Sequence, residues 1–290
     1  MPEAQQKLSI DWIASYPRSG NTWTRFLLTY AVFGESAGDW NIDVNRACVD
    51  AHYWAPSLPM CRNPEYRAGV EASMAQELRT GVRNLRKHWP LGDQHYILKT
   101  HFKLSEEHPL LRETNRAVYL LRHPLLVARS SHAFYTMLGF ESRPLDIYLE
   151  EFIDHGGDPR MIAQGFGTWA ENRKSWLTSD RVEVLEVRFE DLRSDTPGQL
   201  TKMLDFLGLE SSTARAETAA QLASQDRLSA LEEDARNRGA FSAGNHEVSD
   251  QGRTINKGLI DIQDQVSPDA LARFRSTWAE VMGEAGYPMP

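Results

Sequence analysis

A buried strand that runs straight into a glycine turn and a helix is the most constraining feature of this sequence. The stretch Ile10–Tyr16 (IDWIASY) is short and mostly apolar, which predicts a buried strand. It continues into Pro17–Trp23 (PRSGNTW), and Thr22–Val32 then carries apolar residues at helical spacing. Free backbone N–H groups and the helix dipole at such a helix start favour anions. The sequence therefore predicts an α/β chain with an anion site after this strand.

Alternating strand and helix patterns extend along the chain. They predict a three-layer fold with a central, mainly parallel sheet flanked by helices. No internal repeat or linker interrupts residues 1–290, so we expect one domain. The further expected strands are His95–Thr100, Ala117–Leu121 and Val182–Val187, and the further expected helices are Leu125–Leu138, Met161–Leu177, Gly198–Leu207 and a last helix from Ser267 to about Gly286.

Two segments break the alternation. Residues 35–66 are aromatic and read as irregular, and residues 233–262 are polar and dotted with glycines. Long loops in a compact domain are usually lids or binding loops, or else disordered. We expect both segments to lie near the site as lid or acceptor loops.

The loop between the first strand and its helix is rich in donors. Arg18 supplies positive charge, Ser19, Asn21 and Thr22 add polar side chains, and Gly20 lets the backbone approach a ligand closely. The loop has one glycine and no lysine, so it is not the Walker A motif of nucleotide-hydrolysing enzymes. An ordinary strand–helix turn is the alternative interpretation.

The run Tyr16–Trp23 (YPRSGNTW) resembles the 5′-phosphosulfate loop of sulfotransferases that use 3′-phosphoadenosine 5′-phosphosulfate (PAPS), which typically reads Y-P-K-S-G-T-T-W. The Asn-Thr-Trp variant looks like bacterial enzymes that sulfate natural products. The resemblance implies a P-loop-like fold and a PAPS donor. Arg18 stands where the family has a lysine that contacts the bridging oxygen of the leaving phosphate. The positive charge is kept, but arginine is a planar fork and not a point donor.

A second phosphate motif follows the strand Ala117–Leu121. Arg122 begins Arg-His-Pro, and Ser130 lies eight residues later in the expected helix. In the family this pattern binds the 3′-phosphate, so the resemblance implies that role here. A surface salt bridge for Arg122, and a helix serine bonded back to a carbonyl for Ser130, are the alternatives.

The strand His95–Thr100 ends in Lys99-Thr100-His101, which resembles the family's K-T-H element. The resemblance implies that His101 is the general base. A neutral imidazole, with an ordinary pKa of about 6.5, can take the proton of an attacking hydroxyl. Lys99 and Arg18 would offset charge on the transferring group and the departing phosphate. His52 and His132 are the other histidines considered, and no metal-ligand cluster is visible.

The remaining family motifs that contact PAPS match this sequence only in part. Phe189 stands where the family has a tyrosine beside the adenine, and Trp23 can stack on a purine, although both rings could equally be core residues. Lys257 and Gly258 match the family's late loop over the 3′-phosphate. The usual arginine of that loop is absent, and the arginines that could replace its charge are Arg236, Arg238 and Arg253.

Composition sets outer limits on function. The net charge of −8 argues against a general nucleic-acid or anionic-membrane partner, although a local basic pocket is compatible with it. Two cysteines, Cys48 and Cys61, do not make a secreted disulfide framework and are expected to be reduced. The chain shows no signal peptide and no apolar run approaching the roughly 20 residues that span a bilayer. We expect a cytoplasmic protein.

These observations predict an enzyme that moves a sulfuryl group from PAPS to a hydroxyl or amine of a small-molecule acceptor. The aromatic segment 35–66 suggests a ring-bearing or amphipathic acceptor, such as a natural product. A P-loop-like small-molecule kinase is the alternative enzyme, and a catalytically silent nucleotide-binding protein on the same fold is the alternative of another class. The sequence identifies neither the acceptor nor the oligomeric state.

Overall fold

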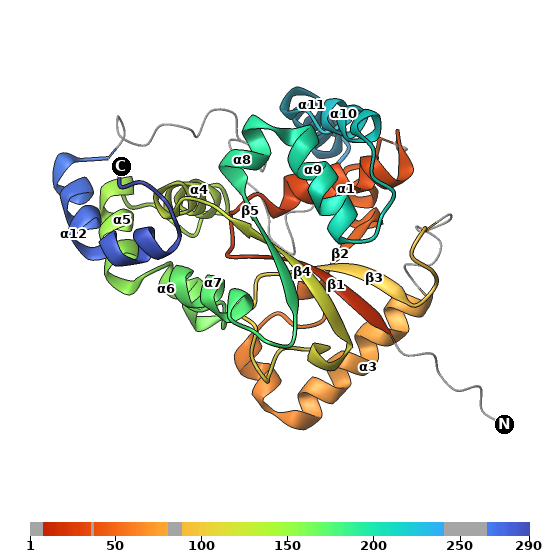
Figure 1. Cartoon of the computed structure of the whole chain (residues 1–290). Coiled ribbons are helices and arrows are strands. Elements are labelled where there is room, and N and C mark those ends of the chain that lie inside the picture. Colours follow the sequence, from red (N-terminus) through yellow and green to blue (C-terminus); the bar gives the residue numbers. More distant parts are fainter. Residues whose placement is uncertain (1–7, 36–37, 81–88, 241–265) are drawn as a thin grey trace.

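Five parallel strands form the centre of the protein (Figure 1). The computed structural model describes residues 8–35, 38–80, 89–240 and 266–290. The strands lie in the order β2-β3-β1-β4-β5, and all four neighbouring pairs are parallel. The predicted three-layer fold with a parallel sheet is confirmed. The strands are β1 (Ser9–Ser15), β2 (Cys48–Asp50), β3 (His95–Thr100), β4 (Thr114–Leu121) and β5 (Glu183–Arg188).

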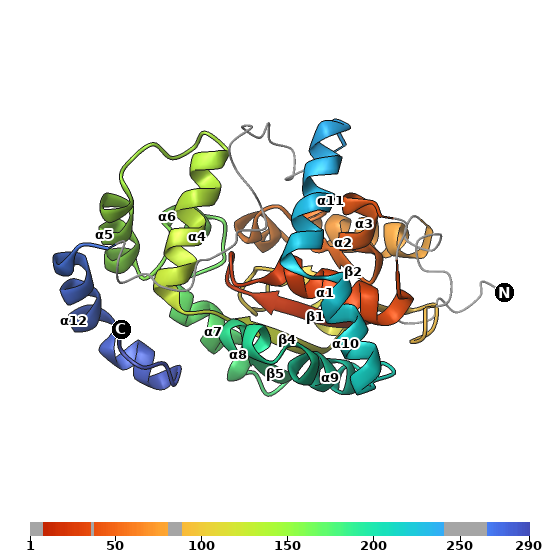
Figure 2. The ribbon, with the colours of Figure 1, turned by 90° about the horizontal axis from the view of Figure 1, so that it is seen from above.

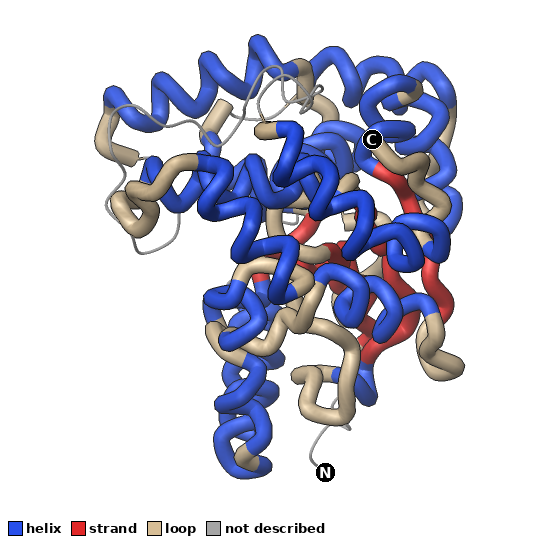
Figure 3. The backbone as a smooth tube through the Cα atoms, turned by 90° about the vertical axis from the view of Figure 1, so that its left-hand side faces the viewer, coloured by secondary structure: helices blue, strands red, loops and turns tan. Residues whose placement is uncertain are grey.

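Each face of the sheet is buried under helices, as parallel sheets require. Side chains alternate along a strand, so Trp12 and Tyr119 enter one apolar cluster while Ile13 and Val118 enter the other. Figures 2 and 3 show the strands enclosed by these two layers. On the Trp12 side lie α3 (Pro64–Thr80), α4 (Pro124–Met137), α5 (Leu145–His155), α6 (Pro159–Ala163), α7 (Trp169–Leu177) and α12 (Pro268–Glu284). On the Ile13 side lie α1 (Asn21–Phe33), α2 (Trp40–Arg46), α8 (Phe189–Ser194), α9 (Thr196–Phe206), α10 (Thr213–Leu222) and α11 (Gln225–Asn237).

The prediction of one helix over Met161–Leu177 is wrong, because the chain turns between α6 and α7. Gly165 and Gly167 both have positive φ, of 94° and 76°, which ends the first helix. Thr168 then starts α7 with a capping box in which its side chain and that of Glu171 bond each other's backbone N–H. The apolar spacing continued across this break, so periodicity alone did not show it.

The prediction that residues 35–66 are irregular is also wrong. This segment contains α2, β2, two 3₁₀ helices (Ala51–Tyr53 and Leu58–Arg62) and the start of α3. Asp39 caps α2 by accepting from the backbone N–H groups of Asn41 and Ile42. Strand β2 has three residues, which is too few for an alternating pattern to register. The predicted loop 233–262 begins inside α11, and its residues 241–262 lie outside the described residues.

A fully buried amide ties α7 to the sheet. The Asn172 side chain donates to the carbonyl oxygens of His101 (2.8 Å) and Phe166 (2.7 Å) and accepts from the Tyr119 hydroxyl (2.8 Å). Three groups from three segments therefore depend on one side chain. Since buried polar groups are costly when unpaired, this amide helps to fix the backbone at the end of β3.

Replacing this amide should destabilise the fold. We expect Asn172→Ala to lower the free energy of unfolding by about 2–4 kcal/mol. The substitution leaves the Tyr119 hydroxyl and the carbonyl groups of His101 and Phe166 in the core without this hydrogen-bond partner. Urea denaturation measures the change. Thr218→Ala, which removes an exposed hydroxyl bonded only to the Ala214 carbonyl of its own helix (2.9 Å), should cost no more than about 1 kcal/mol. Equal losses in the two variants would contradict this role for Asn172.

Candidate active site

The carboxyl ends of the five strands open onto a cavity of about 1040 Å³. In a parallel sheet these ends share one edge, which is the usual place for a ligand. Each strand contributes to the lining at or just after its end: Asp50 from β2, Lys99 and His101 from β3, Arg18 and Gly20 after β1, Arg122 after β4, and Phe189 after β5.

Positive charge gathers in this cavity although the chain as a whole is acidic. Of the described lining residues, one is a carboxylate, Asp50, and six are basic. The cavity therefore suits an anionic ligand. The basic residues are Arg18, Arg25, Lys99, Arg122, Arg160 and Arg193.

The loop after β1 presents its backbone to the cavity. Gly20 caps α1 with φ of 96°, and the Phe189 ring packs so closely that any Cβ on Gly20 would overlap it. Asn21 donates to the Ile13 carbonyl (3.1 Å). The Ser19 hydroxyl and the Asn21 Oδ1 are buried without a hydrogen-bond partner among the described residues. Of these two atoms, the Ser19 hydroxyl can donate to an anion, whereas the Asn21 amide oxygen only accepts. Ser19 stands between Arg18 and Gly20 of the cavity lining and is not itself part of that lining.

The two predicted phosphate motifs meet in space. Arg122 donates through Nη1 to the Arg18 carbonyl (2.9 Å), and Arg18 donates through Nε to the Ser130 hydroxyl (3.2 Å). The Arg122 guanidinium lies 4.5 Å from the centre of the Phe189 ring. The Arg18 guanidinium therefore lies beside Ser130, a residue of the predicted 3′-phosphate site, although the sequence assigned Arg18 to the leaving phosphate on the 5′ side.

Both arginines keep their charge despite burial. Loss of solvent lowers the pKa of Arg18 and of Arg122 to about 10. Since this value is well above neutral pH, both groups are cations at pH 7. The Arg122 Nε is buried without a partner among the described residues, so one donor of its fork is free for a ligand.

The orientation of His101 is fixed by a backbone carbonyl. Its Nδ1 lies 2.9 Å from the Ser15 carbonyl oxygen and 3.2 Å from the Ser15 hydroxyl. Because a carbonyl oxygen only accepts, Nδ1 carries the proton and Nε2 keeps its lone pair. Burial, together with the nearby Lys99 and His52, holds the pKa of His101 well below its usual value. The imidazole is therefore neutral at pH 7.

A cluster of charged and titratable side chains surrounds this imidazole. The Lys99 ammonium lies 3.1 Å from the Asp50 carboxylate and 3.4 Å from Nδ1 of His52. The rings of His52 and His101 are 5.2 Å apart, centre to centre. His132, also considered from the sequence, lies elsewhere, with its Nε2 2.8 Å from the Arg143 carbonyl.

Comparison with known proteins agrees with this geometry. A family model described as the sulfotransferase domain matches residues 11–286. The chain belongs to the sulfotransferase domain family. Sulfotransferase 2A2 of Rattus norvegicus is 26% identical over 200 residues, covering 68% of this chain and 58% of the relative. Sulfotransferase 2A6 of Mus musculus is 28% identical over 202 residues with the same coverage. The match thus spans less than two thirds of these relatives' own length.

Solved structures share the fold of this sulfotransferase domain. Retinol dehydratase in a complex with retinol and PAP aligns with a TM-score of 0.61 and 20% identity, covering 98% of this chain and 84% of that one. Mouse sulfotransferase SULT7A1 complexed with PAP aligns with a TM-score of 0.57 and 17% identity, covering 96% and 85%. At these identities the likeness shows the fold.

Aromatic rings line two parts of the sulfotransferase cavity. Near the loop after β1, the Trp23 and Phe189 rings meet edge to face at 5.8 Å, and Trp23 donates to the Ala223 carbonyl (2.9 Å). Phe166 lies beside the rings of His52 (5.4 Å) and His101 (5.9 Å), and Tyr53 and Phe140, which also line the cavity, are largely exposed. Sequence reasoning did not single out Phe140 or Phe166, since nothing distinguished them from core aromatics.

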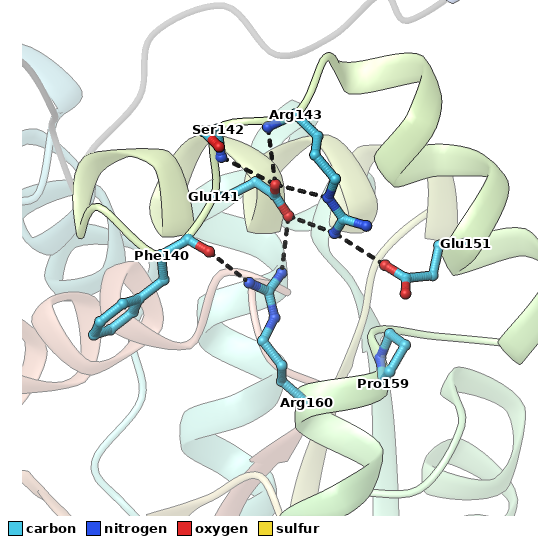
Figure 4. Close-up of a pocket in the computed structure, with 7 residues that line it drawn as sticks. All are labelled: Phe140, Glu141, Ser142, Arg143, Glu151, Pro159 and Arg160. Carbon is cyan, nitrogen blue, oxygen red and sulfur yellow. Dashed lines mark hydrogen bonds and ion pairs between the residues drawn. The ribbon is translucent and has the colours of Figure 1, made fainter.

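A charged network holds the turn that carries Phe140 (Figure 4). The buried Glu141 carboxylate accepts from Arg143 Nη2 (2.7 Å) and lies 3.5 Å from Arg160 Nη2. Arg160 also donates to the Phe140 carbonyl (3.2 Å), and Arg143 reaches Glu151 (3.0 Å). These groups border a smaller hollow of about 370 Å³ and satisfy one another, so we interpret them as support for the cavity rim.

The late part of the predicted donor site is only partly described. Lys257, Gly258 and Arg253 lie outside the described residues. Arg236 pairs with Glu232 within α11 (2.8 Å), and Arg238, directly after α11, pairs with Asp234 (2.9 Å). Among the described residues of the sulfotransferase domain, no group of three or more His, Cys, Asp and Glu side chains could hold a metal ion. None of the described helices is long and apolar enough to cross a membrane.

The close packing of Phe189 on Gly20 generates a prediction for donor binding. We expect Gly20→Ala to weaken binding of adenosine 3′,5′-bisphosphate at least about tenfold, because the new methyl group overlaps Phe189 and the φ of 96° strains alanine. Isothermal calorimetry measures the affinity. Gly34→Ala, at the other end of α1, also has positive φ but meets nothing within 4 Å. Similar affinities for both variants would contradict a role of the Gly20–Phe189 contact.

Proposed function

We propose that this protein transfers a sulfuryl group from PAPS to the hydroxyl or amine of a small-molecule acceptor. The family supports the reaction class. The observation that carries the proposal is that Arg18, Arg122, Lys99 and His101 line one cavity at the carboxyl edge of the sheet. Two basic groups and an anion-binding helix start suit a nucleotide with phosphates at both ends, and an imidazole with a free lone pair suits the acceptor.

The donor would lie across the ends of β1, β4 and β5. The backbone of Gly20–Trp23 and the unpaired Ser19 hydroxyl suit the 5′ side, while Arg122 and Ser130 suit the 3′-phosphate. Arg18 donates to Ser130 through Nε, and its Nη groups would contact the phosphate on the 5′ side. Phe189 and Trp23 offer ring surfaces to the adenine. Lys257 and Gly258 would complete the 3′ side.

His101 would accept the proton of the attacking group. As the acceptor oxygen forms its bond to sulfur, its proton passes to Nε2 of His101, and Ser15 holds the Nδ1 proton in place. The bond between sulfur and the bridging oxygen breaks, and adenosine 3′,5′-bisphosphate leaves with that electron pair. Lys99 and Arg18 offset the negative charge that develops on the departing phosphate. Positioning and electrostatics are sufficient for such in-line transfer.

The acceptor would be an apolar molecule with a ring. Tyr53, Phe140 and Phe166 supply apolar surface within the cavity that holds His101. Two of the similar structures contain androsterone and retinol, which are ringed apolar alcohols. A natural-product acceptor, a part in secondary metabolism and a cytoplasmic location stay predictions from the sequence.

An activity screen tests the proposed function. The protein is incubated with PAPS and a panel of phenols, alcohols and amines, and mass spectrometry detects a product that has gained one sulfuryl group. A parallel incubation with ATP detects phosphorylation, and calorimetry detects binding of adenosine 3′,5′-bisphosphate. Phosphorylated product would indicate a kinase instead, and binding without turnover would indicate a silent nucleotide-binding protein.

Replacing the proposed base should separate turnover from binding. We expect His101→Ala to lower kcat about 100-fold or more, because the acceptor then loses its proton to water, while the affinity for adenosine 3′,5′-bisphosphate changes little. Steady-state kinetics and calorimetry measure the two effects. The control is His132→Ala, which removes a histidine outside the cavity lining and should leave kcat within about twofold. Wild-type turnover by His101→Ala would remove His101 from this role.

The lowered pKa of His101 predicts the acid side of the pH profile. A base whose pKa lies below its ordinary value stays neutral, and therefore active, as the pH falls through about 6.5. The acid limb of kcat against pH should thus have its midpoint below pH 6.5. A midpoint above that value in the wild type would contradict a buried neutral His101 as the base.

A further inference from the structure

The register of the sheet places a carboxylate beside Lys99. Asp50 is the last residue of β2 and pairs with Lys99 of the neighbouring parallel strand β3. Both oxygens of the Asp50 carboxylate lie within hydrogen-bond distance of the Lys99 ammonium, at 3.1 and 3.3 Å. The backbone pairing of two strands therefore sets this contact, unlike an ion pair between long surface side chains.

Asp50 also faces groups from other elements. Nη1 of Arg25, on α1, lies 3.7 Å from its carboxylate, and Nδ1 of His52 lies 3.3 Å from it. The backbone N–H of His52 donates to the same carboxylate (3.0 Å). Burial alone would raise the pKa of Asp50, but Lys99, His52 and Arg25 together hold it well below its usual value. Asp50 is therefore an anion at pH 7, and it offsets the positive charges of Lys99 and Arg25.

The cations depend on this single negative charge. Of the described cavity-lining residues, Asp50 is the one carboxylate, and Lys99 and Arg25 are both largely buried. Without Asp50, the Lys99 ammonium would share a poorly solvated site with Arg25, His52 and His101. Burial lowers the pKa of Lys99, and the positive charge of Arg25 lowers it further. Asp50 raises this pKa, and Cys48 raises it to a smaller extent. Loss of the carboxylate would thus favour a neutral Lys99, which cannot offset charge on a departing phosphate.

We propose that Asp50 is a positioning residue of the transfer site, acting through Lys99: its carboxylate keeps the ammonium charged and holds it at the cavity wall beside His101. The inference rests on the proposed function, which gives Lys99 its part in sulfuryl transfer. In this role Asp50 acts through Lys99 and not by touching the donor or the acceptor. Its carboxylate lies within ion-pair distance of Lys99, Arg25 and His52.

The ionisation of Lys99 tests the proposal without relying on activity. Competitive acetylation, read peptide by peptide by mass spectrometry across a pH series, gives the pH at which Lys99 loses its proton. In Asp50→Asn this midpoint should fall by about one pH unit or more, because an opposite charge at hydrogen-bond distance has been removed. An unchanged midpoint would overturn the proposal.

Kinetics then show whether Asp50 acts through Lys99. Asp50→Asn should lower kcat about tenfold and move the alkaline limb of the pH profile to lower pH, without weakening binding of adenosine 3′,5′-bisphosphate. In a Lys99→Met background the same substitution should change kcat by less than about twofold, because its target is gone. An equal loss in both backgrounds would overturn the proposal.

Two further variants keep the test decisive. Asp154→Asn removes a carboxylate that pairs with Arg273 on the surface (2.7 Å), and it should leave kcat and the acetylation midpoint of Lys99 unchanged.

If Asp50→Asn alone does not fold, Asp50→Asn combined with Lys99→Met removes both charges and should restore folding. Failure of this double variant to fold would count against the proposal. An inactive wild-type protein would overturn the proposed function, while the acetylation would still decide whether Asp50 controls the charge of Lys99.

Discussion

Parallel pairing of all five strands is the constraint on which the site depends. Because the strands run the same way, their carboxyl ends lie at one edge, and residues distant in sequence reach one cavity. Ser15 at the end of β1 orients His101 after β3, and Arg122 after β4 donates to the carbonyl of Arg18 after β1. The site is therefore held by contacts between strand ends, and the buried Asn172 links one of them to α7.

Burial of charge gives this cavity its chemical character. Arg122 is buried, and Arg18 and His101 are half-buried at the cavity wall; the two arginines remain cations, whereas His101 remains neutral. The same loss of solvent thus keeps a base unprotonated beside groups that attract an anion. Asp50 balances part of the positive charge, at the end of the cavity where Lys99 and His101 lie. The opposite end, around Arg122, has positive charge for a ligand phosphate to neutralise.

Sequence patterns predicted the parts of this structure that depend on local order. Strand β3 has the predicted bounds, and Gly20 lies at the start of α1 as the loop motif required. The eight-residue spacing of Arg122 and Ser130 was informative because a strand end and the second turn of the following helix face the same edge. The direction of each side chain could not be predicted in the same way. Arg18 has a positive φ of 67°, which the sequence does not indicate, and its side chain contacts Ser130.

Features set by tertiary contacts were missed. Strand β2 is three residues long and exists because β3 pairs with it, so Asp50 had no pattern that could reveal it. The break between α6 and α7 depends on the backbone at Gly165 and Gly167, while the apolar spacing ran on through it.

The central claim is that one cavity holds an adenosine with a phosphate at each end, next to His101. The most direct measurement is calorimetric titration of the wild-type protein with adenosine 3′,5′-bisphosphate and, separately, with adenosine 5′-monophosphate. The account predicts that the bisphosphate binds at least about tenfold more tightly, because Arg122 gains a partner only from the 3′-phosphate. Equal affinities, or no heat with either nucleotide, would contradict it.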